Sequence, residues 1–143
     1  VDVMVRKNAA TCIREVAKHT PELAKLIVNS GGAAALVDYV TEAQGNNKLP
    51  GVMALGYISA FSETLALATI VSKRIAPIKE ALISEPEDHI KAACAWTLGQ
   101  IGRHTPDHAR AMAEGDVLRH LLACMVHEDS SEDYGCNEAR VCR

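Results

Sequence analysis

The chain has 143 residues, of which 48% are hydrophobic and only 3% aromatic, and its formal charge is −3. An interior of Ala, Val, Leu and Ile is typical of closely packed helices rather than of β-sandwiches. The acidic balance excludes nucleic acid as an expected partner, and no apolar stretch reaches the roughly 18 residues that a membrane span needs. Five cysteines without CxxC spacing favour reduced thiols, so we expect an intracellular, cytoplasmic protein.

The first predicted element is a long helix that ends near His19. Its apolar residues recur at helical spacing and predict one buried stripe of Val5, Ala9, Cys12, Ile13 and Val16. Thr20-Pro21-Glu22 predicts the start of a short helix, because Thr caps free amides, Pro suits the first helical position and a carboxylate favours the helix dipole. Ser30-Gly31-Gly32 ends it, since glycine permits a left-handed turn. A medium helix of about a dozen residues follows from about Ala33 to the break at Gly45-Asn46-Asn47.

The same three elements recur along the chain at steps of 42 or 43 residues. Equivalent positions form the sets Ile13, Leu55 and Leu98; Val16, Ile58 and Ile101; Ala24, Ala66 and Ala109; Leu36, Ile78 and Leu121; Val40, Leu82 and Met125. Ser62-Glu63 and Thr105-Pro106-Asp107 repeat the short-helix start, and further medium helices are predicted near Ile75 and Val117. Within one domain, 1–143, we therefore predict a long helix of a partial repeat (1–19), full repeats (20–61 and 62–104), a partial repeat (105–129) and an irregular tail (130–143).

This pattern predicts an all-α, right-handed armadillo-repeat superhelix, an α-solenoid with three helices per repeat of about 42 residues, whose long helices line a concave groove. Three stretches carry a more specific resemblance: 14–24 (REVAKHTPELA), 49–57 (LPGVMALGY) and 85–107 (EPEDHIKAACAWTLGQIGRHTPD). They resemble the C-terminal part of the sperm-associated antigen 6 family, armadillo-repeat proteins of the ciliary and flagellar central apparatus. The resemblance extends from about Val5 to Asp133.

The resemblance implies a protein-interaction scaffold of the axonemal central apparatus, which supports motility and the integrity of the central-pair microtubules. It implies central-apparatus proteins as partners, with tubulin or microtubules among the candidates, and a location in the cytoskeleton of the cilium or flagellum. Because family members carry about twice as many repeats or more, we expect this chain to be a fragment or a short form. Uncapped solenoid ends also predict self-association.

Register places the lining of the expected groove. Importin-alpha uses Trp followed four residues later by Asn on successive long helices, and the equivalent pairs here are Trp96 with Gln100, Met53 with Tyr57, and Thr11 with Glu15. Because the pairs differ, a basic-peptide adaptor of the importin-alpha type is the alternative rather than the main hypothesis. Lys18 and Arg103 fall on the same stripe. Trp96 by itself fits either a packing residue or a ligand contact, and the charged residues fit either a solvated face or a binding surface.

Histidines and cysteines predict no metal site. His104 and His108 are four apart but separated by a helix break, and His19 is the repeat equivalent of His104, so we expect both His19 and His104 to serve the turn between helices. We expect the side chains on apolar stripes to act as small hydrophobes, namely Cys12, Cys94 and Cys124. Cys136 and Cys142 fall in the tail.

No motif predicts an enzyme or a cofactor. The sequence has no phosphate-binding glycine loop after a strand, no GxSxG and no HExxH. The acidic cluster of Glu85, Glu87 and Asp88 lies in a predicted polar turn, where we expect solvated carboxylates. We therefore predict no catalytic, cofactor-binding or metal-binding residue.

Overall fold

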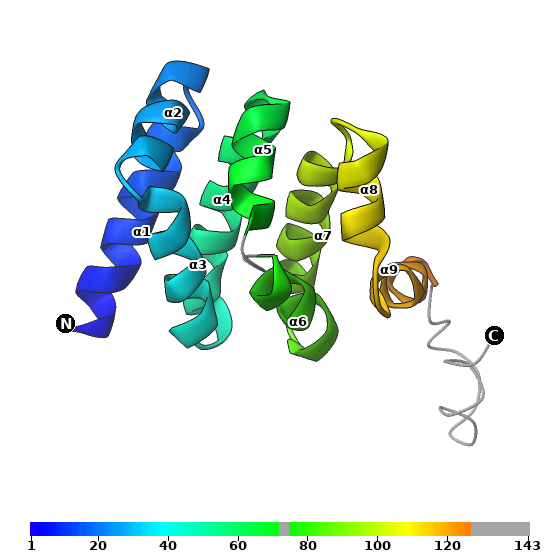
Figure 1. The fold of residues 1–143 in the computed structure, drawn as a ribbon. Coiled ribbons are helices and arrows are strands. Elements are labelled where there is room, and N and C mark those ends of the chain that lie inside the picture. The colour runs from blue at the N-terminus through cyan, green and yellow to red at the C-terminus, as the bar shows by residue number, and fades with distance from the viewer. Residues whose placement is uncertain (72–74, 127–143) are drawn as a thin grey trace.

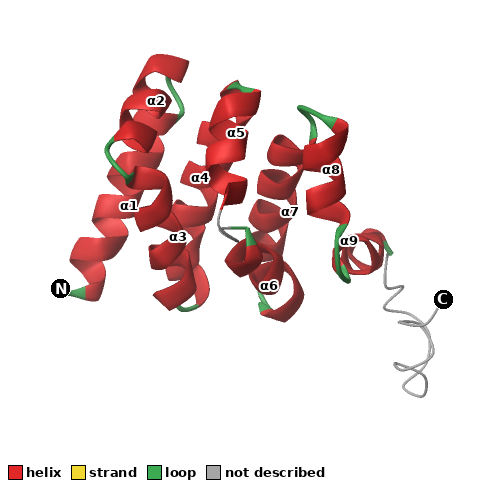
Figure 2. Cartoon of the chain, in the orientation of Figure 1, coloured by secondary structure: helices red, strands yellow, loops and turns green. Residues whose placement is uncertain are grey.

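The computed structural model describes residues 1–71 and 75–126, and within these ranges it contains helices and connecting turns without a strand (Figure 2). The helices are α1 (Val3–Ala17), α2 (Pro21–Asn29), α3 (Gly32–Glu42), η1 (Gly45–Lys48), α4 (Leu49–Phe61), α5 (Glu63–Ile70), α6 (Ala76–Ser84), α7 (Asp88–Gly102), α8 (Pro106–Ala113) and α9 (Val117–Met125). The expected break at 128–130, the tail at 130–143, Cys136 and Cys142 lie outside the described residues.

The predicted short-helix starts are confirmed by their capping hydrogen bonds. Thr20, Ser62 and Thr105 each accept from the backbone amide three residues on, at 3.2, 3.2 and 3.0 Å. Each hydroxyl satisfies one of the amides that lack a partner within the first helical turn. The predicted turn after α2 is confirmed at Gly31, whose φ of +81° lies in the left-handed region that favours glycine.

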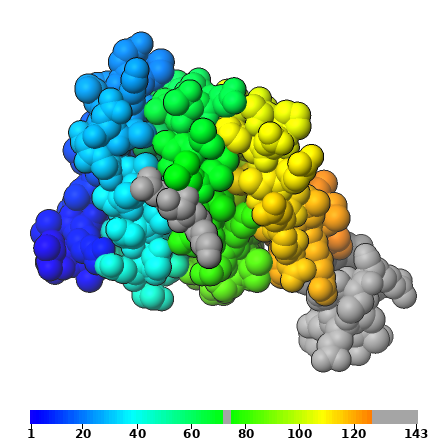
Figure 3. Space-filling model, viewed as in Figure 1, coloured from blue at the N-terminus to red at the C-terminus, as the bar shows by residue number. Residues whose placement is uncertain are grey.

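The helices stack in chain order to form a solenoid. The long helices α1, α4 and α7 lie side by side, with α4 packed between the other two, and α3, α6 and α9 follow one another in the same order (Figure 1). In the space-filling view the chain runs across the molecule in successive bands from blue to orange (Figure 3). The predicted α-solenoid is thereby confirmed, and its repeat boundaries remain predictions.

The core runs along the solenoid axis and is built from aliphatic side chains of the long and medium helices. The bulkiest of its fully buried members are Leu36, Leu55, Ile58, Ile78, Leu82, Ile90 and Ile101. Each such side chain contributes about 1.5–3 kcal/mol when it is removed from water. Since these side chains pack between neighbouring repeats, they hold the long helices in a fixed register.

Polar contacts to α4 from α7 and from the turn after it add to this register. The buried Thr97 hydroxyl donates to the Val52 carbonyl at 3.0 Å, and the His104 ring nitrogen Nε2 lies 2.6 Å from the Ser59 carbonyl. Both acceptors belong to the backbone of α4. One acceptor lies in the first turn of α4, whereas the Ser59 carbonyl lies in the last turn, where the helix itself supplies no donor.

The predicted buried stripe on α1 is wrong for most of its members. Val5 is 58% exposed and Val16 38% exposed, Ala9 and Cys12 are exposed too, and the buried residues of α1 are Ala10 and Ala17. Only one long helix, α4, packs beside α1 among the described residues, so the opposite side of α1 has no neighbour. The periodicity was real, but burial depends on a second repeat.

A smaller difference concerns the length of the medium helices. The medium helices α6 and α9 have nine residues each instead of about a dozen. The end of α6 at Ser84 is explained by Pro86, whose ring disfavours helical geometry in the residue before it.

In the described part of the chain no single helix is long and apolar enough to cross a membrane; α2 and α3 meet that criterion only as a pair bent by 77°.

Candidate protein-binding surface

The predicted groove residues lie on the three neighbouring long helices. We call this surface the long-helix face and define it by the partly or fully exposed residues Thr11, Arg14, Glu15, Lys18, Met53, Tyr57, Trp96, Gly99, Gln100 and Arg103. Because α4 packs against both α1 and α7, the face continues across all three helices. All eight predicted residues belong to it, and their role in binding remains a prediction.

An aromatic pair joins α4 to α7 at the middle of this face. The rings of Tyr57 and Trp96 meet edge to face, with centroids 5.1 Å apart and planes inclined by 68°. Such aromatic contacts contribute about 0.5–1.5 kcal/mol beyond area burial. Both side chains are half-buried, so each ring packs against the protein and keeps a part open to solvent. The two interpretations of Trp96, packing residue and surface contact, are therefore compatible.

Trp96 takes this position because α4 carries no side chain beneath it. A Cβ at the buried Gly56 would lie 2.8 Å from Trp96 Cε3 and 2.7 Å from Thr97 Oγ1, both closer than carbon and oxygen atoms approach without a shift. Glycine thus brings α7 close to α4 and leaves room for the indole against the helix. The other predicted residue of α4, Met53, is half-buried and packs against the core, which limits it to a supporting role.

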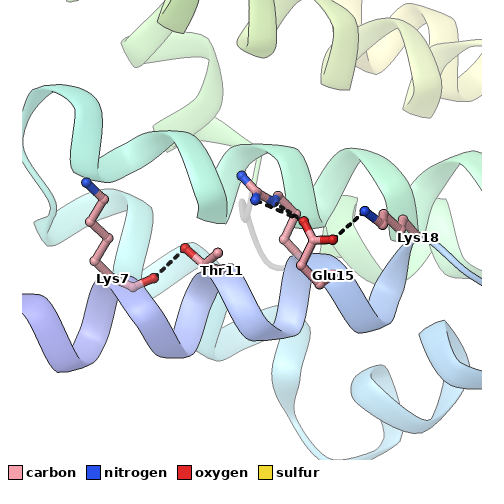
Figure 4. A network of polar contacts seen from close by, with 5 residues as sticks. Lys7, Thr11, Glu15 and Lys18 are labelled. Carbon is pink, nitrogen blue, oxygen red and sulfur yellow. Dashed lines mark hydrogen bonds and ion pairs between the residues drawn. The ribbon is translucent and has the colours of Figure 1, made fainter.

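On α1 the polar residues of the face interact mainly with one another (Figure 4). The Thr11 hydroxyl donates to the Lys7 carbonyl at 2.8 Å, which ties it to its own helix. Glu15 Oε1 accepts from Arg14 Nε at 3.1 Å and Nη2 at 2.9 Å, and its Oε2 accepts from Lys18. The hydrogen bond from Lys18, with that from Arg14, lowers the pKa of Glu15, so this carboxylate keeps its charge in mildly acidic solution.

Arg103 brings a further cation to the opposite side of the aromatic pair. Its Nη2 donates to the Ala60 carbonyl at 2.7 Å, while the residue as a whole is exposed. A guanidinium suits this place because the carboxyl end of α4 carries partial negative charge. Gln100, one turn earlier on α7, is half-exposed and brings an amide to the same surface. The face therefore presents three basic side chains and one acidic side chain around Tyr57 and Trp96.

Two residues that shape this face, one on it and one buried beneath it, were not predicted from the sequence. Arg14 forms the two-nitrogen contact with Glu15, and Gly56 forms the base under Trp96. Both could have been found from the repeat register: Arg14, Gly56 and Gly99 are equivalent by the same steps of 42 and 43 residues that relate the predicted pairs. A glycine in the middle of a long helix disfavours helix formation and so indicates a packing reason.

The histidines differ from one another more than their equivalence suggested. His19 and His104 were both expected to serve the turn between helices, but His104 contacts the preceding long helix, whereas His19 is exposed and its ring has no hydrogen-bond partner among the described residues. His108 is buried in α8, on the far side of the break at Thr105. In residues 1–71 and 75–126 no three His, Cys, Asp or Glu side chains are placed to hold a metal ion together.

The cysteines and the acidic turn also correct two expectations. Of the three cysteines that the structure describes, only Cys94 is buried. Its burial, with a smaller effect of Glu85, raises its thiol pKa to about 12, whereas Cys12 and Cys124 are exposed instead of packed. Glu85 is half-buried rather than solvated, and its carboxylate lies 3.6 Å from Lys48 Nζ. This ion pair joins the turn before α7 to η1.

The fold and this surface define the class of protein: an armadillo-type α-solenoid. Among solved structures, an engineered protein superimposes with a TM-score of 0.83 at 21% identity, over 91% of this chain and 52% of that chain. A designed armadillo repeat protein in complex with the peptide (KR)4 gives a TM-score of 0.77 at 17% identity, over 87% of this chain and 51% of that chain. At these identities the likeness establishes the fold alone.

Among curated proteins the chain is similar to sperm-associated antigen 6. It is 64% identical to the protein of Homo sapiens and 62% identical to that of Mus musculus, in both cases over 52 residues. The match covers 36% of this chain and 10% of each relative, so the resemblance is confirmed over a shorter stretch than the range from Val5 to Asp133 that we expected. No protein-family profile matches the chain. Fold and relatives together support a repeat scaffold for protein interaction.

Proposed function

We propose that this chain is a protein-interaction scaffold of the axonemal central apparatus, where it supports ciliary and flagellar motility and the integrity of the central pair. The similarity to sperm-associated antigen 6 supports this assignment to a flagellum-associated protein. Partners on this proposal are central-apparatus proteins, tubulin among them. The observation that carries the binding role is the long-helix face with the Tyr57–Trp96 pair at its centre.

The chemistry of this face indicates what kind of segment it binds. Tyr57 and Trp96 offer half-exposed rings for aliphatic or aromatic side chains, and such anchors commonly dominate protein interfaces. Arg14, Lys18 and Arg103 surround them, with Glu15 as the single carboxylate. The face is therefore basic although the chain carries a formal charge of −3, and it favours an extended segment with acidic residues beside an apolar anchor.

A basic-peptide adaptor remains the alternative function. The designed armadillo repeat protein in the comparison is a complex with (KR)4, and Trp96 followed by Gln100 has the spacing that such adaptors use. The three cations of the face oppose this alternative, because like charges brought together at an interface weaken binding and slow association. A measurable preference for acidic over basic peptides separates the two functions.

The test is an affinity pull-down from flagellated cells with the intact chain and with a Tyr57→Ala/Trp96→Ala variant, analysed by mass spectrometry. We expect tubulin or central-apparatus proteins with the intact chain and their loss with the variant. The control is Leu26→Ala/Leu67→Ala, which removes two exposed side chains, 61% and 47% accessible, from α2 and α5. Loss of the same partners with this control would refute a role of the long-helix face.

Peptide titrations complete the test. Trp96 is the only tryptophan, so its fluorescence reports binding at the face directly. A glutamate-rich peptide with one leucine anchor is expected to bind more tightly than (KR)4, and added salt is expected to weaken it. Tighter binding of (KR)4, together with recovery of nuclear-import cargo, would replace the scaffold proposal by the adaptor.

A further inference from the structure

Both ends of the described solenoid expose apolar side chains whose repeat equivalents are buried. On α1, Val16 is 38% exposed, whereas Ile58 and Ile101 at the equivalent positions are 0% exposed. On α9, Met125 is 80% exposed, whereas Leu82 and Val40 are 1% and 0% exposed. Leu118 and Leu122 extend the second surface, at 54% and 65% exposure. We call these surfaces the α1 end and the α9 end.

Contacts inside the solenoid show which residue positions cover the equivalents of each surface. On α4, a Cβ at Gly51 would lie 2.8 Å from Val40 Cγ2 of α3, so these two positions pack directly against each other. Gly51 is the repeat equivalent of Ala9, and Val40 is the equivalent of Met125. Ala9, which is exposed on α1, therefore has the position that covers a residue such as Met125.

A polar contact follows the same register. His104, in the turn after α7, places its Nε2 2.6 Å from the Ser59 carbonyl near the end of α4, the preceding long helix. The equivalents of these two residues are His19 and Gly102. His19 is exposed at the α1 end, and Gly102 is the last residue of α7, the last described long helix. The α1 end therefore has the imidazole donor, His19, and the α9 end has the matching acceptor, the carbonyl of Gly102.

We propose that two copies of this chain associate head to tail, with α1 of one copy packed as the next long helix against α7, α8 and α9 of the other. In this arrangement Ala9 covers Met125 of the neighbouring copy, and His19 reaches the Gly102 carbonyl of that copy. The contact continues the stacking that already joins α1 to α4 and α4 to α7. Because the two surfaces differ, the contact is heterologous and does not close on itself in a dimer, so longer assemblies form as the concentration rises.

The test uses sedimentation velocity on the full chain, with Ala9→Glu to block the α1 end and Met125→Glu to block the α9 end. Over roughly 10 to 200 µM the unaltered chain is expected to rise from its monomer mass through dimers to longer species, since association follows mass action. Each single variant is expected to stay at the 15.3 kDa of one chain. Both substituted residues are exposed, so circular dichroism should find each variant folded.

Mixing the two variants is the decisive arm. Ala9→Glu keeps an intact α9 end and Met125→Glu keeps an intact α1 end, so an equimolar mixture should form a one-to-one dimer of twice the monomer mass and nothing longer. Thr64→Glu is the control, because it adds the same charge at an exposed position of α5, and it should associate like the unaltered chain.

Each contrary result overturns the proposal. An unaltered chain that stays monomeric over the same concentration range would exclude the head-to-tail contact. Dimers that persist in only one of the variants would indicate a contact between like surfaces. Failure of the mixture to form a dimer would exclude the pairing of these two ends.

Discussion

Substitution of Gly56 by alanine tests the packing that creates the candidate site. The added methyl group would overlap Trp96 and would lie 2.7 Å from Thr97 Oγ1. Thr97 cannot yield easily, because it is fully buried and its hydroxyl donates to the Val52 carbonyl at 3.0 Å. Trp96 is half-buried and has solvent on one side, so we expect the indole to swing outward and lose its edge contact with Tyr57.

Three effects set the size of the change. Overpacking of a filled interface costs about 1–3 kcal/mol. Loss of the contact between Tyr57 and Trp96 costs a further 0.5–1.5 kcal/mol or so. Alanine in place of glycine stabilises a helix interior by about 1 kcal/mol in the opposite direction. The overpacking term exceeds the helix-propensity term, and we expect a net destabilisation of about 2 kcal/mol.

Urea unfolding measures this difference, with circular dichroism for the helices and the emission of the single tryptophan for the site. The emission of Trp96 in the folded variant should shift to the red as the indole becomes more exposed. The matched control is Gly99→Ala: a Cβ there meets nothing within 4 Å, so this variant should be up to about 1 kcal/mol more stable than the original chain.

A second variant isolates the cause. If the clash with the indole produces the loss, Trp96→Leu should remove part of the penalty of Gly56→Ala, which a double-mutant cycle detects as a coupling energy. A Gly56→Ala chain as stable as the original, with unchanged tryptophan emission, would refute the close packing of α7 on α4.

Further predictions concern single side chains. Glu15 should titrate below its ordinary pKa of 4.5 in an NMR experiment, so its ion pairs are complete above that pH and are lost as the pH falls through the lower folded-state pKa; a value at or above 4.5 would contradict the contacts. Glu15→Gln should strengthen binding of an acidic peptide, and unchanged affinity would mean that the face does not hold it. In dilute native protein at pH 8, iodoacetamide should modify Cys124 and leave Cys94 unmodified, because burial raises the pKa of Cys94 to about 12; rapid modification of Cys94 by site-resolved mass spectrometry would refute this. Thr97→Val should lower the free energy of unfolding by about 1 kcal/mol, since it removes the hydrogen bond to Val52, and a neutral effect would show that the bond adds little.

Local signals predicted most of the helices. Thr20 and Thr105, each followed by proline, fixed the starts of α2 and α8, because a cap and a proline act through backbone geometry within one helical turn. The left-handed turn at Gly31 followed from the same kind of information. The period of 42 or 43 residues then predicted the solenoid, since a pattern that repeats whole groups of helices stacks one group on the next.

The candidate site was predicted in position but not in its contacts. Register placed Tyr57 and Trp96 on neighbouring long helices, yet their edge contact depends on the space above Gly56, which a linear pattern does not measure. The pairing of Glu15 with two cations likewise depends on rotamers and on which side of α1 remains open.

Burial along α1 was decided by tertiary structure alone. Val5, Cys12 and Val16 have the spacing of a buried stripe, and their equivalents in α7, namely Ile90, Thr97 and Ile101, are fully buried. The sequence by itself determined where helices begin, how they repeat and which positions are equivalent, because these depend on local backbone chemistry and periodicity. Which equivalent positions are covered depends on whether a neighbouring repeat lies against them, and only the folded arrangement supplies that neighbour.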